Sequence, residues 1–458
     1  MRLLTVFVTA LLVFLALQYA EAKMDDARFE ELKKDLTKTI KSDASGAKSK
    51  ISELAQDDSD RAVDLLVSLS NNITSNAELI DAVQSAFNTM NSEEALKSIS
   101  RYAKGGAGDY KMRIILLEAL ASKNGEIVVQ TLLEAIDDSK DEVACTAIRA
   151  LGDKRDENTI EPIISFMEKL ARKKDRGRIY NDCRIALEKI TGKKGPEEAK
   201  DWRNWYESYK TGGDSGGQQN PKPVLGGGDF KTSSFFGLTI DSDRIIFVID
   251  VSGSMTVADP PPEAWVPDRD LGKLETTAVD EEEKKKKEKE LEEIKKNWEK
   301  ERQRIYRVKK ELVRVIDSLD KSVKFNIIAF SDQISSWKDK LQPASSGNMS
   351  NAKAWVEALN ADGLTCTDGA IREAFKDKDV DTVVLLSDGA PTHIGGEGRA
   401  EWGGHQDSMA IIGSIYSWLE ENNKFRKVTI HTIGFKGANF EFMEKLAKDN
   451  NGTFRDIP

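Results

Sequence analysis

The sequence predicts an all-α unit of helical repeats followed by an α/β unit with a mostly parallel sheet, and three observations predict this order. Residues 23–210 are rich in Leu, Ala, Glu and Lys with few prolines, which is typical of helices. A Gly/Pro-rich stretch at 211–229 is typical of a linker. Beyond it, apolar runs such as 245–249 indicate strands that are buried on both faces, as in a parallel sheet covered by helices. The length of 458 residues agrees with two or three domains.

The first 22 residues have the pattern of a signal peptide. Arg2 precedes an apolar run at 3–17, and the small-x-small sequence Ala20-Glu21-Ala22 follows. The apolar run is too short for an ordinary membrane span, although an uncleaved N-terminal anchor stays an alternative. We therefore expect an exported protein, periplasmic or secreted, without a transmembrane segment after signal cleavage.

Residues 23–210 contain a weak internal repeat. Residues 116–121 correspond to 147–152 after 31 positions, and 183–188 follow after another 36. The pattern favours HEAT-like helix pairs stacked into a short solenoid, in which no repeat buries its apolar face alone. A generic helical bundle is the alternative. At the end of this region four aromatic residues share one helix face, which indicates a terminal cap more than a ligand site: Trp202, Trp205, Tyr206 and Tyr209.

Composition narrows the function classes. A net charge of −10 argues against a nucleic-acid-binding protein, and 39% hydrophobic residues suffice for real cores. Three cysteines do not make a disulfide framework, even in an oxidising compartment. Cys145 and Cys183 could pair between neighbouring helices, but two buried thiols are the preferred interpretation. Cys366 is interpreted as a small residue packed under a loop.

Hard oxygen ligands gather where the first predicted strand ends. Asp250, Ser252 and Ser254 occupy alternate positions directly after the apolar run, and Gly253 lets the backbone curl between them. One carboxylate and two hydroxyls around a point describe a site for Mg²⁺, Mn²⁺ or Ca²⁺. The simpler alternative is a strand that ends in a Ser/Gly turn.

Two further oxygen donors lie downstream in matching positions. Thr365 stands in a polar loop before a short helical pattern, and Asp388 ends the apolar run at 381–387. Ligands of open α/β sheets bind at the carboxyl ends of the strands. We therefore expect Asp388 to lie where Asp250 lies.

At this point the sequence resembles the von Willebrand factor A (VWA) domain with its metal-ion-dependent adhesion site (MIDAS). The family pattern is Asp-x-Ser-x-Ser, then Thr, then Asp, and every position is present: Asp250, Ser252, Ser254, Thr365 and Asp388. The resemblance covers about 230–458, including predicted strands at 323–332 and 428–435 and a last helix at 440–450. It implies a doubly wound, Rossmann-like domain with a mostly parallel sheet. It also implies that the two serines and the threonine touch the metal directly, and that the aspartates act through water.

The resemblance implies a binding protein. A divalent cation, Mg²⁺ first and Mn²⁺ or Ca²⁺ as alternatives, would be completed by an acidic side chain of a protein partner. We therefore expect the protein to function in metal-dependent adhesion or as a metal-dependent adaptor. The alternative is a structural scaffold whose helical repeats bind the partner while the cation only stabilises the VWA domain. We expect no enzyme, because no nucleophile with its base, no His-Glu-x-x-His and no Gly-x-Ser-x-Gly is present.

The sequence departs from the family at a charged insertion, at about 260–302. Its second half is a charge run typical of a solvated helix. Apolar residues at steps of three and four nevertheless continue from Leu291 through Trp298 to Leu319, a heptad-like seam that only Glu301 breaks. The insertion is either a lid or recognition element beside the cation, or a self-packed hairpin. Self-association through 280–319 is a further hypothesis.

A glycine-rich loop at 390–405 follows Asp388. It contains two histidines and two glutamates, which could hold a second cation: His393, Glu397, Glu401 and His405. A rim that shapes the choice of partner is the preferred interpretation, because loops on a rigid scaffold carry specificity.

Overall fold

The computed structural model describes ten stretches of the chain: 23–106, 108–173, 177–192, 195–211, 233–240, 242–259, 281–392, 395–396, 399–400 and 408–457. The predicted signal segment, nearly all of the linker, the first half of the insertion, and the histidines and glutamates of the glycine-rich loop lie outside these residues. The chain divides into two compact units, Met1–Gln218 and Gln219–Pro458. Each unit is described by itself, and the domain boundaries predicted above stay predictions.

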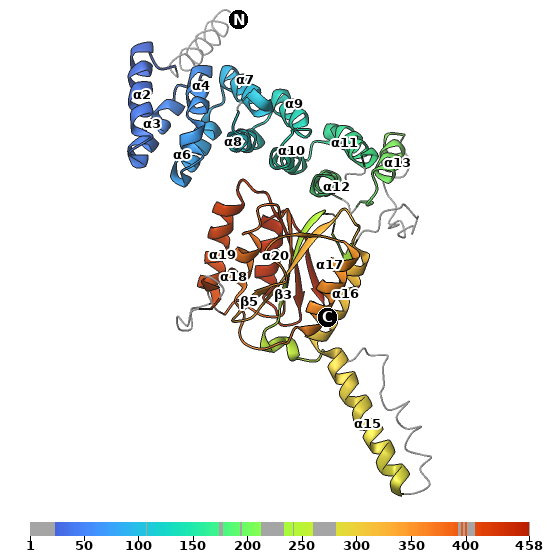
Figure 1. Ribbon diagram of the computed structural model, residues 1–458. Helices are drawn as coiled ribbons and strands as arrows, with labels where there is room; N and C mark the ends of the chain where they lie inside the picture. Colours follow the sequence, from blue (N-terminus) through green and yellow to red (C-terminus); the bar gives the residue numbers. More distant parts are fainter. Residues whose placement is uncertain are drawn as a thin grey trace, which may run out of the picture. The chain divides into compact units, whose positions relative to one another are not determined.

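The first unit is built from helices that alternate between two layers (Figure 1). In one layer α3, α6, α8, α10 and α12 pack against one another in succession, and in the other α4 packs on α7 and α7 on α9. The helices are α2 Asp26–Thr39, α3 Ala44–Ala55, α4 Asp60–Ser68, α5 Ser70–Ile73, α6 Ala77–Thr89, α7 Glu93–Arg101, α8 Tyr110–Ala121, α9 Glu126–Ala135, α10 Asp141–Lys154, α11 Ile160–Arg172, α12 Arg178–Thr191 and α13 Ala199–Lys210.

This stacking is consistent with helical repeats. The three similar segments of the sequence fall in α8, α10 and α12, which are consecutive members of one layer. Polar contacts also link the connections between helices. Asp58, between α3 and α4, accepts from the N–H of Asn91, between α6 and α7, at 2.9 Å. Lys123, between α8 and α9, donates to Asn91 Oδ1 at 3.1 Å. Each contact ties one helix pair to the next, as in solenoids whose stability comes from neighbouring repeats.

The end of the first unit and the cysteines agree with the expectations from sequence. Trp202 of α13 is buried, and Trp205 stacks on Tyr209 with ring centroids 5.3 Å apart. All three cysteines lie in described parts of the chain and are buried and free of disulfide bonds. Burial raises the pKa of the Cys366 thiol to about 12, which agrees with a packing role.

The second unit contains a seven-stranded sheet in the order β11-β10-β7-β3-β4-β5, with β6 also paired to β4. Strands β11, β10, β7, β3 and β4 are parallel, whereas β5 and β6 run antiparallel to β4. The strands of this sheet are β3 Arg244–Asp250, β4 Lys324–Phe330, β5 Ile334–Ser336, β6 Gln342–Pro343, β7 Thr382–Ser387, β10 Thr429–Phe435 and β11 Phe454–Ile457. Two short hairpins, β1 Ser233–Phe235 with β2 Leu238–Ile240 and β8 Gly395–Gly396 with β9 Arg399–Ala400, stand apart from it.

Helices cover both faces of this sheet. Alternate residues of β3 point into different cores: Phe247 packs on the side of α16 and α17, and Val248 on the side of α18, α19 and α20. The helices are α16 Arg304–Ser318, α17 Ser346–Ala358, α18 Thr367–Ala374, α19 Ser408–Asn423 and α20 Phe440–Asp449. The predicted fold class, an all-α unit followed by a doubly wound α/β unit, is thus confirmed. Among the described residues, none of the helices combines the length and the apolar character that crossing a bilayer requires.

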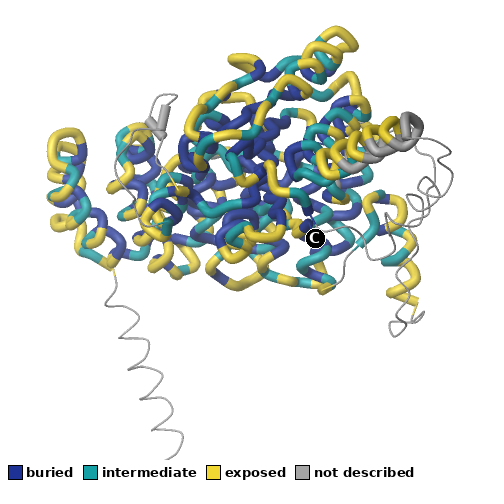
Figure 2. The backbone as a smooth tube through the Cα atoms, turned by 90° about the horizontal axis from the view of Figure 1, so that it is seen from below, coloured by how far each residue is buried: buried dark blue, intermediate teal, exposed yellow. Residues whose placement is uncertain are grey.

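The charged insertion ends in α15 Glu281–Arg302, which extends outward from the second unit (Figure 1). At about 1.5 Å per residue a helix of 22 residues is roughly 33 Å long. Its described side chains are largely exposed (Figure 2). The predicted seam does not run through one helix, because the backbone of Gln303 is non-helical and forms an isolated β-bridge with Ala258. The second half of the seam is buried on the sheet: Ile305, Val308, Leu312, Val315 and Leu319.

Candidate metal centre

The candidate site lies where β3 and β7 end side by side. In the sheet, β3 lies between β4, the next strand along the chain, and β7, to which the chain returns later. The carboxyl ends of β3 and β7 therefore form a topological switch point, and open α/β sheets bind ligands at such points. Asp250, the last residue of β3, is fully buried. Its Oδ1 accepts from the Ser252 N–H at 2.8 Å and its Oδ2 from the Ser387 hydroxyl at 2.5 Å. The carboxylate is therefore held from both strands.

A chain of oxygen atoms links the two strand ends. The Ser252 and Ser254 hydroxyl oxygens are 3.0 Å apart, and the Ser254 hydroxyl donates to Asp388 Oδ1 at 2.7 Å. Ser252 and Asp388 are buried, whereas Ser254 is exposed. The structure thus brings four of the five predicted residues into one hydrogen-bonded cluster with an opening to solvent at Ser254.

The fifth predicted residue, Thr365, lies on a loop that is bound to this cluster. The carbonyl oxygen of Gly363 accepts from the Gly253 N–H at 3.0 Å, and the Thr365 N–H donates to Thr392 Oγ1 at 3.0 Å. A Cβ on Gly389, next to Asp388, would stand 3.5 Å from Thr365 Oγ1. The threonine hydroxyl therefore faces the loop that contains Asp388. Gly363 has a φ of +81° and lies against Asp332, so a side chain at this position would meet the Asp332 carboxylate.

Burial makes the Asp250 carboxylate easier to protonate. It raises the pKa of Asp250 to about 6, and the charge of Asp388 acts in the same direction, while hydrogen bonds from Ser252 and Ser387 oppose both effects. A cation at this position would lower the pKa of Asp250, because its positive charge would stabilise the ionised carboxylate that burial has removed from solvent.

A guanidinium that the sequence did not indicate stands beside the cluster. Arg304 Nη1 donates to Asp388 Oδ2 at 2.7 Å, and its Nε donates to Asp259 Oδ1 at 3.0 Å. The Arg304 side chain is 11% exposed and the Asp388 side chain 0%. Ser387 was also not predicted from the sequence, although its position directly before Asp388 at the end of a strand could have indicated it. Arg304 gave no such signal, because 84 residues separate it from Asp388.

The chemistry of the donors fits a hard divalent cation. Carboxylate and hydroxyl oxygens are the ligands that Mg²⁺, Mn²⁺ and Ca²⁺ prefer. Among the described residues, no cluster of three or more His, Cys, Asp or Glu side chains is arranged for a metal. A site here would therefore depend on serine and threonine hydroxyls for part of its shell.

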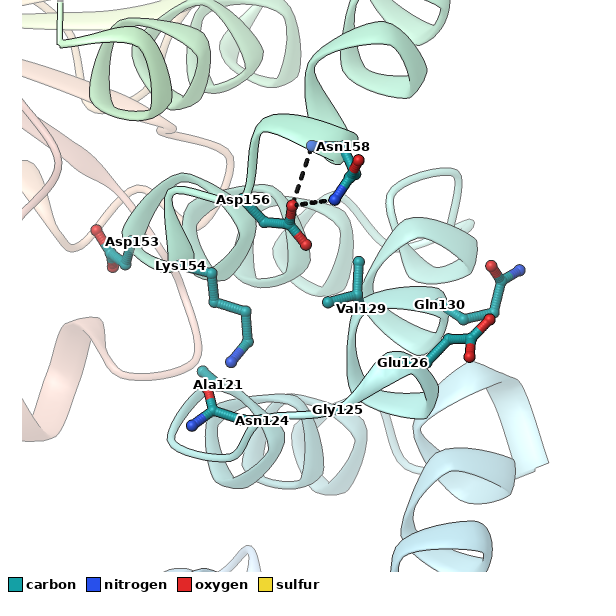
Figure 3. Close-up of a pocket in the computed structure, with 10 residues that line it drawn as sticks. All are labelled: Ala121, Asn124, Gly125, Glu126, Val129, Gln130, Asp153, Lys154, Asp156 and Asn158. Carbon is teal, nitrogen blue, oxygen red and sulfur yellow. Dashed lines mark hydrogen bonds between the residues drawn. The ribbon is translucent and has the colours of Figure 1, made fainter.

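The first unit has a pocket of its own, of about 740 Å³, between the turn after α8 and the end of α10 (Figure 3). It is lined mostly by polar residues, and the Lys154 side chain points into it. Lys154 Nζ donates to the backbone carbonyl of Lys123, and Asp156 Oδ1 accepts from Asn158. Since these groups are already paired with neighbours, the pocket is a weaker candidate than the cluster in the second unit.

The geometry and the sequence comparisons agree on the class of the second unit. Residues 300–456 match the family model for the von Willebrand factor type A domain. The human inter-alpha-trypsin inhibitor heavy chain H4 is 26% identical over 167 residues, which are 34% of this chain and 16% of that protein. The human von Willebrand factor A domain-containing protein 3A is 30% identical over 155 residues, 33% of this chain and 12% of that protein. The second unit is therefore a VWA domain.

The similarity to these proteins covers only part of each chain. The chain aligns with about a sixth of the inter-alpha-trypsin inhibitor heavy chain H4, at 16% of its length. Among solved structures, a von Willebrand factor type A protein from Catenulispora acidiphila has a TM-score of 0.31 at 16% identity, covering 48% of this chain and 40% of that one. Proximal thread matrix protein 1 from the mussel byssus, described with a zinc-occupied MIDAS motif, has a TM-score of 0.26 at 16% identity, covering 46% and 40%.

Proposed function

We propose that this chain is an exported binding protein whose VWA domain holds a divalent cation and uses it to bind an acidic side chain of a protein partner. The observation that carries the proposal is the hydrogen-bonded cluster of Asp250, Ser252, Ser254 and Asp388 at the switch point. The cation would be held directly by the hydroxyls of Ser252, Ser254 and Thr365, with the two aspartates acting through water.

The spacing of the hydroxyls is compatible with Mg²⁺, the first of the candidate cations. Two ligands at right angles around Mg²⁺, each about 2.0–2.1 Å from it, are about 2.9 Å apart. The corresponding separation around Ca²⁺, at about 2.3–2.6 Å, is about 3.3–3.7 Å. The 3.0 Å between the Ser252 and Ser254 oxygens is the length of a hydrogen bond between them, and it is compatible with the smaller ion. Mn²⁺ and Ca²⁺ stay alternatives to be compared by titration.

Apolar side chains around the site support a protein partner. Val257 is 48% exposed and Leu364 is 39% exposed, and they belong to the two loops that contain Ser254 and Thr365. Both side chains are therefore available to a partner that reaches the cluster. A partner carboxylate would complete the shell of the cation while these two side chains pack against the surface around it.

Water relaxation with Mn²⁺ as the probe tests both parts of this proposal. Bound Mn²⁺ is expected to enhance water-proton relaxation, and a short Glu-containing peptide should reduce the enhancement by displacing a water. The same peptide with Gln in place of Glu is the matched control and should have a much weaker effect. Equal Mn²⁺ binding by wild type and Asp250→Ala would contradict the cation site. Equal effects of the two peptides would contradict the acidic partner.

The second candidate function is a scaffold in which the helical repeats bind the partner and the cation only stabilises the VWA domain. The polar pocket between α8 and α10 is the observation that favours it. Asp250→Ala separates the two functions. Loss of partner binding favours the cation site, whereas a lower melting temperature with partner binding unchanged favours the scaffold.

A further inference from the structure

The insertion is anchored at its base directly beside the candidate metal centre. The Asp259 N–H donates to the Arg302 carbonyl at 3.1 Å, and the Arg304 N–H donates to the Val257 carbonyl at 3.0 Å. Arg302 Nε also donates to the Asp259 carbonyl at 2.7 Å. These bonds join the two ends of the insertion, so the first residue of α16, Arg304, has a fixed backbone position next to Asp388.

The Arg304 side chain is held as firmly as its backbone. Its guanidinium donates to Asp388, to Asp259 and, through Nη2 at 2.5 Å, to the carbonyl oxygen of Lys436. Arg307 also donates to Asp259, and both guanidiniums face the Phe435 ring, at 6.0 Å for Arg304 and 5.3 Å for Arg307. The positive charge of Arg304 is therefore confined beside Asp388 by contacts from three segments of the chain.

The charges in the hydrogen-bonded network that links Arg304, Asp388 and Asp250 give this arrangement a consequence. Asp250, Asp388 and Asp259 contribute three carboxylates, against the two guanidiniums of Arg304 and Arg307. This larger network of five charged side chains then has one net negative charge, and a divalent cation changes it to one net positive charge. Without Arg304 the bound cluster would be neutral. Because Asp250, Asp388 and Arg304 are buried, solvent screens their charges only in part, and such a difference changes cation affinity.

We infer that Arg304 is a positioning residue of the metal centre that weakens binding of the divalent cation and leaves the loaded site with an unbalanced positive charge. The inference rests on the proposed cation site and assigns a role to the base of the insertion. Through Arg304 the insertion keeps part of the Asp388 charge away from the cation. The remaining positive charge is then balanced by an anionic group from outside the chain.

Titration calorimetry of Mg²⁺ into the full-length chain tests the inference, with Arg304→Gln as the main variant. We expect Arg304→Gln to bind Mg²⁺ at least tenfold more tightly than wild type. Arg304→Lys, which keeps the charge, should stay within about threefold of wild type. Arg314→Gln is the matched control, because Arg314 lies on the same helix and pairs with Glu311 away from the site, and it should not change the affinity.

A purely structural role of Arg304 predicts the opposite sign, since a displaced Asp388 would bind the cation more weakly. Equal or weaker binding by folded Arg304→Gln therefore overturns the inference. Asp259→Asn provides a second test, because it removes a negative charge from the same cluster and should weaken Mg²⁺ binding at least threefold. Tighter or unchanged binding by folded Asp259→Asn also overturns the inference.

The same experiment separates this inference from the proposed function. Binding by wild type without a gain in Arg304→Gln rejects only the role of Arg304. Binding by Arg304→Gln alone also supports that role, because the wild type then binds Mg²⁺ too weakly to be detected. Absence of Mg²⁺ binding in every variant rejects both the inference and the cation site.

Discussion

Asp250 combines complete burial with a carboxylate that has to be ionised to hold a cation. Its two oxygens accept hydrogen bonds from Ser252 and Ser387, yet burial still raises its pKa to about 6, above the ordinary value of 3.8. The ionised side chain therefore costs free energy in the metal-free fold, and a bound cation would offset that cost.

The raised pKa of Asp250 predicts a pH dependence with a definite sign. The folded state without metal binds the proton more tightly than the unfolded state does, so the stabilisation is complete below about pH 3.8 and is lost as the pH rises through about 6. Metal-free wild type should lose melting temperature across this window relative to Asp250→Asn. Mg²⁺ affinity should fall by about tenfold per pH unit below pH 6, because the cation has to displace the proton. A Mg²⁺ affinity that is flat between pH 5 and 7 would contradict this assignment.

The five candidate residues could be proposed from the sequence because each follows the end of a strand or opens a loop beside one. Asp250 and Asp388 end apolar runs, and the alternate spacing of Ser252 and Ser254 shows in the sequence itself. Arg304 was not predictable. It begins a helix after a long insertion, and its contacts with Asp388 and Asp259 depend on how that insertion closes at its base.

At the scale of elements, the helices α10 and α12 approach each other closely at Gly152. A Cβ at this position would stand 2.9 Å from Ala186 Cα, a backbone atom that cannot turn away. This contact gives a physical reason for the glycine that ends the repeated segment 147–152. Sequence similarity indicated the repeat, but the close packing of α10 and α12 can be seen only in the structure.

Gly152→Ala should therefore destabilise the first unit. Helix propensity alone predicts a gain of about 1 kcal/mol for this change, whereas the clash should cost about 1–3 kcal/mol. Gly413→Ala in α19 is the control, because nothing lies within 4 Å of a Cβ there, and it should be neutral or stabilising. Denaturant unfolding followed by circular dichroism measures both variants. A stabilised Gly152→Ala would show that α10 and α12 are not packed in this way.

The arm α15 differs from the sequence prediction in a way that has a structural cause. The heptad-like seam predicted a continuous pattern from Leu291 to Leu319, but Gln303 has a non-helical backbone and forms a β-bridge with Ala258. The helix that packs on the sheet therefore begins at Arg304, and the arm ends at Arg302. Periodicity of apolar residues could not reveal this interruption, because the pairing partner lies before the insertion.

Deletion of residues 272–300 should leave the VWA domain folded with its Mg²⁺ affinity within about threefold of wild type. The bonds that close the base of the insertion, from Asp259 to Arg302 and from Arg304 to Val257, lie outside the deleted segment. Thermal melting and Mg²⁺ titration of the deletion variant check this expectation. Loss of partner binding in a deletion variant that still binds Mg²⁺ would support the arm as a recognition element. A drop in Mg²⁺ affinity of tenfold or more would mean that the arm itself shapes the site.

At the scale of the whole molecule, the chain joins a unit stabilised by neighbouring helix pairs to a unit whose seven-stranded sheet has a core on each face. The order of the two fold classes was predictable, since helical composition and buried strands leave different patterns in the sequence. The sheet order and the pairing of β3 with both β4 and β7 were not, because they depend on contacts between residues far apart in the chain.

The two units should respond differently to Mg²⁺ in a calorimetric melt. At a concentration about a hundred times its dissociation constant, a ligand of the folded state adds about 2.7 kcal/mol. For a domain of this size that corresponds to roughly 5–10 °C in melting temperature. Only the transition of the VWA domain should shift, and chelator should reverse the shift. An equal shift of both transitions would contradict a cation site confined to the second unit.

The central claim is that the hydroxyls of Ser252 and Ser254 hold a divalent cation, and calorimetric titration of Mg²⁺ into wild type and the Ser252→Ala/Ser254→Ala double variant tests it most directly. We predict one binding site in wild type, with Mn²⁺ and Ca²⁺ titrated in parallel for comparison, and no detectable site in a double variant with unchanged circular dichroism. Equal binding by the two proteins would place the cation elsewhere and contradict the account.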